Sequence, residues 1–209
     1  MKNLINFYSA ILLVFFAFNL SGQVGVRAGV NLANLSVDPE DDEFSPGTKL
    51  GFGVGIFYKL KAGDNLTVQP ELNFMQQGAK SDIEFLGVSA ESTISFNYLQ
   101  VPVMVKYGFG DMDATNFYIQ GGPYIGLGIG KVKSKTCIDG DCEEDEQEYG
   151  DGEDGPKNPD FGLQLGAGVN LNSKISFDAR YILGLANLNG GEEGTIKHTG
   201  INISVGYSF

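Results

Sequence analysis

The sequence is poor in the residues that most enzymes and nucleic-acid-binding proteins need. It has no tryptophan, one histidine, two cysteines and 14 basic residues against 26 acidic ones, for a formal net charge of −12. This charge argues against nucleic acid as a partner, because phosphate binding requires clustered Lys and Arg. No nucleophile elbow is present, and catalysis by a serine–histidine–acid arrangement would depend on the single His198. We therefore expect a non-enzymatic protein without a cofactor.

The two cysteines allow either a disulfide or part of a metal site. Cys137 and Cys142 are separated by four residues, and no further thiol or histidine lies nearby to complete a metal site. If the chain is exported, a disulfide between them would persist. We predict the disulfide and no metal.

The first 22 residues have the pattern of a signal peptide. Lys2 supplies a positive start, residues 4–20 are largely apolar, and Ser21 and Gly22 form a small-residue exit. A transmembrane helix is the alternative, but no stop-transfer charges follow. No cysteine lies at the junction, which argues against a lipid-anchored form. The prediction is a signal peptide at 1–22 and one domain at 23–209.

Most of the remaining chain alternates between apolar and polar residues. In YLQVPVMVKYGFG (98–110), Leu99, Val101 and Val103 share one face while Gln100 and Met104 share the other. Similar segments occupy 24–35, 50–60, 66–77, 116–130, 161–171, 175–188 and 201–209. Tight turns at 62–65, 108–115 and 172–174 alternate with longer loops at 36–47, 78–92, 131–160 and 189–195.

This pattern predicts an all-β protein, an eight-stranded antiparallel barrel in the outer membrane. Gly, Asn, Gln, Ser and charged residues on one face suit a crowded lumen, and a closed sheet leaves no unpaired backbone in hydrocarbon. A soluble lipocalin-like barrel or a β-sandwich is the alternative. Pro70, Pro102 and Pro123 fall inside strands, so we expect bulges or broken pairing there. The apolar parity also shifts between Phe96 and Leu99, which suggests an irregularity or a segment above the membrane.

Two sets of barrel residues are candidates for function. With the N-terminus at the periplasmic side, an aromatic girdle is expected at the periplasmic strand ends, formed by Tyr58, Tyr107, Phe117, Phe177, Tyr207 and Phe209. An interior charge network is expected from Arg27, Lys59, Glu71, Lys106, Asp178 and Arg180. These charges could form a plug that locks the barrel or line a narrow pore, and inward glycines could leave a water path.

Acidic residues collect in the loops opposite the girdle. The segment from Cys137 to Asp154 reads CIDGDCEEDEQEYGDGED, and the loop at 36–47 adds five acids. One interpretation is a solvated acidic crown. Another is divalent-cation binding that bridges to lipopolysaccharide or a protein partner, although the spacing of an EF-hand is absent.

Several segments resemble a known family. YLQVPVMVKYGF, GGPYIGLGIG, FGLQLGAGVNL, ARYILGLANL and the closing ISVGYSF are similar to the PorT-like outer-membrane β-barrel ("porin family") proteins of Bacteroidetes. The resemblance implies the fold and the outer-membrane location, and Phe209 resembles the signal that barrel-assembly machinery recognises. It implies little about activity. We expect a structural or interaction protein, with a small passive channel or an accessory subunit of a secretion system as alternatives.

Overall fold

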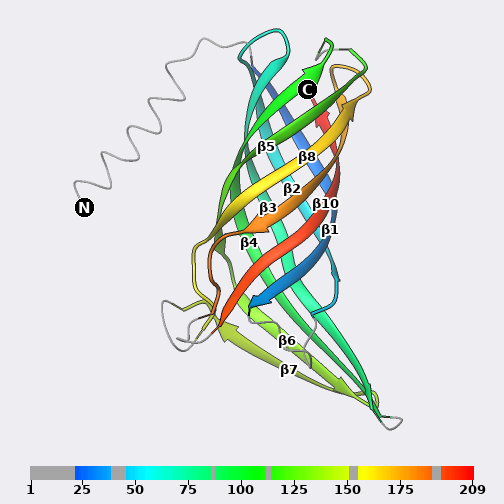
Figure 1. The fold of residues 1–209 in the computed structure, drawn as a ribbon, viewed down its shortest axis with the longest axis vertical. Helices are drawn as coiled ribbons and strands as arrows, with labels where there is room; N and C mark the ends of the chain where they lie inside the picture. Colours follow the sequence, from blue (N-terminus) through cyan, green and yellow to red (C-terminus); the bar gives the residue numbers. More distant parts are fainter. Residues whose placement is uncertain (1–21, 39–45, 86–87, 112–113, 151–154, 190–193) are drawn as a thin grey trace, which may run out of the picture.

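The computed structural model describes residues 22–38, 46–85, 88–111, 114–150, 155–189 and 194–209 (Figure 1). The predicted signal peptide therefore lies outside the described residues except for Gly22. Within these ranges no helix has the length and apolar character needed to cross a membrane. The chain forms ten strands, which are β1 (Gln23–Asp38), β2 (Lys49–Lys61), β3 (Leu66–Phe85), β4 (Val88–Phe109), β5 (Asn116–Gly128), β6 (Lys131–Ile138), β7 (Asp141–Glu148), β8 (Asp160–Asn170), β9 (Ile175–Gly184) and β10 (Thr195–Ser208).

Eight of the strands close into a barrel, as the sequence predicted. The ring order is β1-β2-β3-β4-β5-β8-β9-β10, and antiparallel pairing of β1 with β10 closes it. Each strand of the ring therefore has a neighbour on both sides. Closure satisfies the backbone without exposing a sheet edge in the barrel wall.

The two ends of the barrel differ in their connections. At the turn end, which we define by the connections 62–65, 110–115 and 171–174, at most six residues join one strand to the next. Asn172 closes one of these connections, because its Oδ1 accepts hydrogen bonds from the backbone N–H groups of Lys174 and Ile175, both at 2.8 Å. At the opposite end, the loop end, the strands β3, β4, β6 and β7 extend well past the barrel (Figure 1).

The loop end contains more strand than the sequence analysis predicted. The predicted loop at 78–92 is wrong: β3 continues to Phe85 and β4 starts at Val88, so the two form a long hairpin. The predicted loop at 131–160 contains a second hairpin, β6–β7, whose strand β6 pairs with β4 over residues 90–95. Together β3, β4, β6 and β7 form a sheet beyond the barrel, which we call the protruding sheet (Figure 1).

The three strand prolines interrupt pairing without shifting the register. Between β2 and β3 the pairs resume at Leu60↔Val68, in the same register as Phe57↔Glu71. The β3–β4 ladder has a similar gap beside Pro102, and the β4–β5 ladder has one beside Pro123. Of the two predicted outcomes, locally broken pairing is therefore correct and bulges are not. A proline has no N–H for the ladder, which accounts for the gaps.

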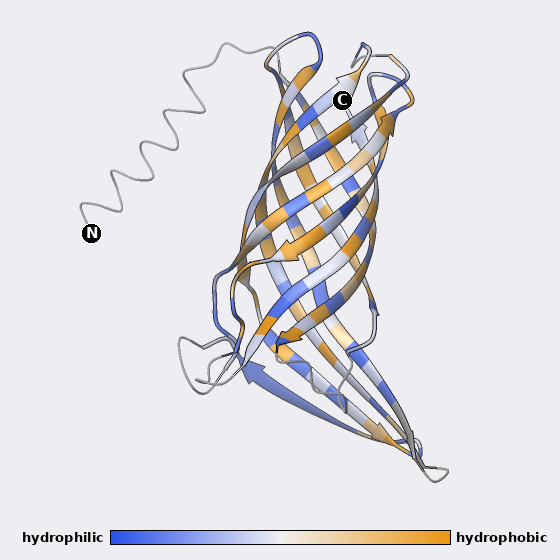
Figure 2. Ribbon diagram, in the orientation of Figure 1, coloured by the Kyte–Doolittle hydropathy of each residue, from blue (hydrophilic) through white to orange (hydrophobic). Residues whose placement is uncertain are grey.

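The barrel wall has its apolar side chains outside. On β4, Val101, Val103 and Val105 are 40–45% exposed, whereas Gln100 and Lys106 on the other face are buried. Figure 2 shows the corresponding alternation of hydrophobic and hydrophilic residues along the barrel strands. An exposed apolar wall around a polar interior is the arrangement of a transmembrane barrel and excludes the soluble alternatives.

The apolar residues of β4 change from odd to even positions between Leu99 and Phe96, and an irregular strand is not the cause. The β3–β4 register is the same from Leu66↔Tyr107 to Phe85↔Val88. The even-numbered residues therefore stay on the inner face, and it is their chemistry that changes: Phe96 and Tyr98 are apolar, buried and inward-facing. The outward residues on this part of the strand, such as Ser95 and Asn97, are polar. Beyond the barrel wall, the strand thus has the polarity of a water-soluble sheet.

Candidate functional site

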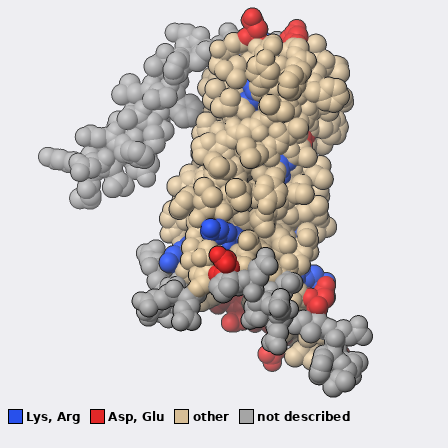
Figure 3. All heavy atoms as spheres, viewed as in Figure 1, with Lys and Arg blue, Asp and Glu red and all other residues tan. Residues whose placement is uncertain are grey.

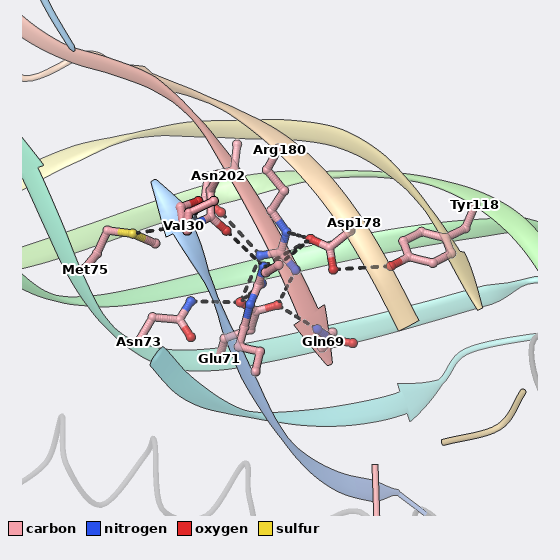
Figure 4. Close-up of polar contacts among 12 residues, drawn as sticks. Val30, Gln69, Glu71, Asn73, Met75, Tyr118, Asp178, Arg180 and Asn202 are labelled. Atoms are coloured by element: carbon pink, nitrogen blue, oxygen red, sulfur yellow. Dashed lines mark hydrogen bonds and ion pairs between the residues drawn. The ribbon is translucent and has the colours of Figure 1, made fainter. Parts of the chain in front are cut away.

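The centre of the lumen contains a buried network of ion pairs (Figure 4). Arg27 on β1 donates from Nη1 to Glu71 Oε2 at 2.7 Å and from Nη2 to Asp178 Oδ1 at 3.1 Å. Arg180 on β9 donates from Nη2 to Glu71 Oε1 at 2.8 Å and from Nε to Asp178 Oδ1 at 2.8 Å. All four side chains are at most 6% exposed. The two arginines and two carboxylates therefore neutralise one another away from solvent.

This network crosses the full width of the barrel. In the eight-strand ring, β3 and β9 lie four strands apart in both directions, so they are opposite one another. Arg180 binds both carboxylate oxygens of Glu71, because its Nη1 also lies 2.9 Å from Oε2. Such a bidentate pair fixes distance and orientation together. The Glu71–Arg180 pair is thus a bridge between opposite walls.

Neutral side chains donate further hydrogen bonds to the two carboxylates. Gln69 and Asn73 donate to Glu71 at 2.6 and 2.9 Å from either side along β3. Asp178 accepts from the Tyr118 hydroxyl at 3.4 Å and from Ser204 Oγ at 3.3 Å. Ser204 also accepts a short hydrogen bond from Arg27. Because so many donors converge on two carboxylates, the network favours a single arrangement of its members.

The other two residues of the predicted charge network lie outside these ion pairs. Lys106 is buried in the lumen with its Nζ 4.7 Å from the centre of the Tyr118 ring, a cation–π geometry. Lys59 lies near the turn end with its Nζ 5.6 Å from the Phe57 ring. The structure therefore brings together Arg27, Glu71, Asp178 and Arg180, and places the two lysines nearer the turn end.

The inward glycines make room for large side chains. A Cβ at Gly25 would lie 2.3 Å from the Phe57 ring, and one at Gly168 would lie 2.5 Å from the Tyr118 ring. A Cβ at Gly128 would similarly meet Tyr149. These positions were predicted as the feature that could leave a water path. Instead, an aromatic ring occupies the space beside each of these three glycines. The ring lies so close to the backbone that only a residue without a side chain fits there.

A cluster of aromatic side chains covers the loop end of the lumen. His198 is fully buried between Phe96 and Tyr98, with ring centroids 4.9 and 5.2 Å away and both contacts edge-to-face. Its Nε2 lies 3.2 Å from the Tyr98 hydroxyl. Val132 of β6 and the partly buried Tyr149 pack on the same cluster. We call Phe96, Tyr98, Val132, Tyr149 and His198 the aromatic lid.

The aromatic lid was not predicted from the sequence. From the sequence, His198 was considered only as part of a catalytic arrangement, and the full burial of its side chain was not predicted. A signal was present, because Ile94, Phe96 and Tyr98 alternate with polar residues. That pattern was interpreted as an irregularity or as a segment above the membrane. The continuous β3–β4 register contradicts the irregularity and leaves the segment above the membrane.

The protruding sheet carries the acidic segment. On its outer face, Lys133 binds Glu146 at 3.2 Å and Lys135 binds Glu144 at 3.6 Å across the β6–β7 hairpin. Hydrogen bonds from Lys133 and Lys131 lower the pKa of Glu146. The predicted disulfide between Cys137 and Cys142 is present at the hairpin tip, with a Cα–Cα distance of 4.0 Å.

The other face and the free edge of β7 remain acidic. Asp141, Glu143 and Asp145 are exposed and have no ion pair among the described residues. In the part of the chain that the structure describes, β7 pairs with β6 alone, so its second edge is open. Figure 3 shows one face of the molecule, on which charged side chains gather mainly toward the loop end while the barrel wall is almost uncharged. No three His, Cys, Asp or Glu of the described ranges lie close enough to hold a metal ion.

The six predicted girdle residues all lie near the turn end. Five of them are 41–71% exposed on the outer wall, namely Tyr107, Phe117, Phe177, Tyr207 and Phe209. Tyr58 is half-buried and pairs with Val24 at the start of β1. Phe109 also belongs to this group, although it was not predicted: it is 61% exposed and contacts Tyr107 at a centroid distance of 5.6 Å.

A comparison with protein families agrees with this architecture. A family model described as "Outer membrane protein beta-barrel domain" matches residues 18–190, while curated proteins gave no match. Among solved structures, the chain is similar to Ail, the attachment invasion locus protein of Yersinia pestis, at 15% identity, 90% coverage of this chain, 99% of that chain and a TM-score of 0.47. It is also similar to outer membrane protein W of E. coli at 18% identity, 92% and 100% coverage and a TM-score of 0.41. Identities and TM-scores this low carry no functional information.

Proposed function

Because the chain belongs to the outer membrane protein beta-barrel domain family and is an outer-membrane protein, we propose that it is a non-catalytic interaction protein whose barrel is an anchor. In barrels of this class the short turns face the periplasm and the longer loops face outward. On this assignment the turn end is periplasmic and the protruding sheet stands outside the cell. The protruding sheet is then the part of the molecule that an extracellular partner would contact.

The observation that carries the proposal is the open edge of β7. An open strand edge offers unpaired N–H and C=O groups to an added strand, which is how many proteins bind extended peptides. Asp141, Glu143 and Asp145 make this edge acidic, so they would repel a second copy of β7 and attract a basic segment. The proposed partner is therefore a protein with an extended, Lys- or Arg-containing strand.

A peptide-binding experiment tests this proposal. The detergent-solubilised protein is titrated calorimetrically with an eight-residue peptide that alternates Lys and Thr, and with the same peptide N-methylated at alternate residues. Added-strand binding predicts heat for the first peptide and a large loss of affinity for the second, because N-methylation removes backbone donors and keeps the charge. Equal binding of the two peptides, or no binding of either, would contradict the proposal.

A substitution adds a matched control. The double variant Glu143→Gln, Asp145→Asn should weaken binding of the basic peptide, because it removes two of the three negative charges (Asp141, Glu143 and Asp145) beside the open edge of β7. The double variant Glu40→Gln, Asp42→Asn removes the same charge from a different acidic segment. It should leave binding unchanged if β7 is the site. An equal loss in both variants would indicate attraction to overall charge.

The passive channel is the second candidate, and the filled lumen counts against it. Ions would have to pass the Glu71–Arg180 bridge and then the aromatic lid. The role of an accessory subunit in a secretion system, and membership of the PorT-like group, rest on the sequence resemblance alone. Co-purification from solubilised membranes would test the secretion role.

Two contacts with the membrane environment are also part of the proposal. Phe209 is 67% exposed at the end of an alternating strand, and its N–H donates to Val24 O at 2.9 Å. We infer that it is read by the barrel-assembly machinery, so Phe209→Ala should slow insertion into the membrane. We further infer that lipopolysaccharide surrounds the barrel beneath the protruding sheet.

A further inference from the structure

The barrel wall has a groove on its lipid-facing side where β2, β3 and β4 are incompletely paired. The β2–β3 ladder lacks the two pairs that would lie beside Pro70, and the β3–β4 ladder lacks the two pairs that would lie beside Pro102. Both gaps occur within a few residues on the same strand, β3. The wall is therefore interrupted on either side of β3.

The groove at this place has a volume of about 540 Å³, within the range of about 300–1,000 Å³ that is usual for ligand sites. Its walls consist of outward-facing residues from four neighbouring strands, Val24, Ile56, Tyr58, Pro70, Leu72 and Val101. Tyr58 is the one member of this set with a polar side-chain atom. The groove is thus almost wholly apolar.

The groove reaches the inner layer of the wall but is closed there. Phe57 and Glu71 also line it, and both residues face the lumen and are at most 4% exposed. The Glu71 side chain has no exposed area and binds both arginines of the lumen. A ligand in the groove would therefore lie within the wall and would not pass through it.

We propose that this groove is a binding site for one acyl chain of a membrane phospholipid. The groove is continuous with the lipid-facing surface of an outer-membrane barrel, so lipid chains are its neighbours. A chain on the flat wall contacts protein on one side, whereas a chain in the groove contacts protein on several sides and gains dispersion energy. Water is a poor alternative occupant, because an ordered water needs two to four polar partners.

The position of the groove along the barrel axis indicates which membrane leaflet supplies the acyl chain. Val24 and Tyr58 pair with each other at the start of β1, close to the girdle residues of the turn end. If the turn end is periplasmic, the chain comes from the periplasmic leaflet. This site is separate from the protruding sheet, so the inference does not depend on the peptide interaction proposed above.

Tryptophan quenching tests the site cleanly, because the native sequence has no tryptophan. The reporters are Tyr58→Trp in the groove and Phe177→Trp, a girdle position on the distant strand β9. Each is reconstituted in phosphatidylcholine vesicles with an increasing fraction of the same lipid brominated in one chain. A binding site predicts that the residual fluorescence of the Tyr58→Trp reporter in fully brominated lipid is about threefold lower than that of Phe177→Trp, because a chain held in the groove keeps its bromine in contact with the indole ring. Identical curves would overturn the proposal.

Filling the groove provides the second measurement. In the Tyr58→Trp background, Val101→Phe places a ring in the groove and should shift its curve to that of Phe177→Trp. Val105→Phe makes the same change on the same lipid-facing side of β4, outside the groove, and should leave the curve unchanged. If Val101→Phe has no effect, or both variants shift the curve equally, the preference does not arise from the groove. Circular dichroism of each variant verifies that the barrel has folded.

Discussion

Strand β4 has one polarity inside the membrane and the opposite polarity above it. From Leu99 to Phe109 the outward residues are apolar, and the inward ones include Gln100 and Lys106. From Ser89 to Tyr98 the outward residues are polar, and the inward ones include Phe96 and Tyr98. The register with β3 is continuous across the change. The surroundings of the outer face, lipid at the barrel wall and water above it, therefore determine which face of β4 is apolar, while the strand geometry stays the same.

The two halves of the molecule, the barrel wall and the loop end, are consequently stabilised by different interactions. In the wall, lipid covers the outer face, and the lumen is held together by charge-assisted hydrogen bonds among Arg27, Glu71, Asp178 and Arg180. At the loop end, an ordinary apolar cluster occupies the inside and charged pairs such as Lys133–Glu146 lie in water. Substitutions of the same type should therefore have very different effects in the two halves.

The largest expected effect is the loss of a charge from the lumen. Glu71→Gln leaves two buried arginines with one carboxylate, and breaking such a network should lower the free energy of unfolding by about 3–5 kcal/mol. The matched control is Glu91→Gln, which removes an exposed partner of Lys80 and should cost about 0–1 kcal/mol. Urea unfolding in detergent micelles, followed by circular dichroism, measures both. Equal costs would contradict the distinction between the two halves.

Truncation of the aromatic lid should have a comparable effect for a different reason. Phe96 is 3% exposed and contacts His198, so Phe96→Ala should cost about 3–5 kcal/mol through lost burial and the resulting cavity. Ile138 at the same end is 52% exposed, and Ile138→Ala should change stability by less than about 1 kcal/mol. If the two variants unfold at the same urea concentration, the aromatic lid is not a packed core.

A charge on the outer face distinguishes the two halves directly. Val103 and Ser89 lie on the same face of β4, the first in the wall and the second above it. Val103→Lys should destabilise the barrel in vesicles by about 2–4 kcal/mol if the residue lies near the bilayer midplane. Ser89→Lys should have almost no effect, because water already surrounds that position. A similar cost for both would show that the membrane extends farther along β4 than we infer.

The smallest expected effect concerns the β6–β7 hairpin. Replacing Cys137 and Cys142 by serine removes a cross-link outside the barrel ring, so the unfolding of the barrel should be unchanged. Local hydrogen exchange in β7 should nevertheless increase, because opening of this hairpin is a local event. Exchange measured with and without reductant verifies this, and a lowered barrel stability would contradict it.

The barrel could be predicted from the sequence because its signal is local. Alternation in segments such as 201–209 fixes which side chains share a face, and the tight turns fix antiparallel neighbours. The protruding sheet was missed because β3 and β4 lose their apolar outer face beyond Phe74 and Leu99, so the alternation no longer resembles a membrane strand. The hairpin β6–β7 was missed because its Lys and Glu residues pair across strands, a relation that composition does not reveal.

The arrangement in the lumen was predicted only in part. The sequence placed Arg27, Glu71, Asp178 and Arg180 on inward faces, but the register that brings β3 opposite β9 exists only in the closed ring. The rings beside the inward Gly25, Gly128 and Gly168 were not predicted, because each ring comes from a segment that is a neighbour only in the folded barrel.

The closed lumen is the central claim, and single-channel recording in planar bilayers tests it most directly. If the Glu71–Arg180 bridge spans the barrel and the aromatic lid covers its loop end, the pure protein should produce no stable conductance steps at neutral pH. Reproducible nanosiemens steps from the wild-type protein would contradict the account and favour the passive channel.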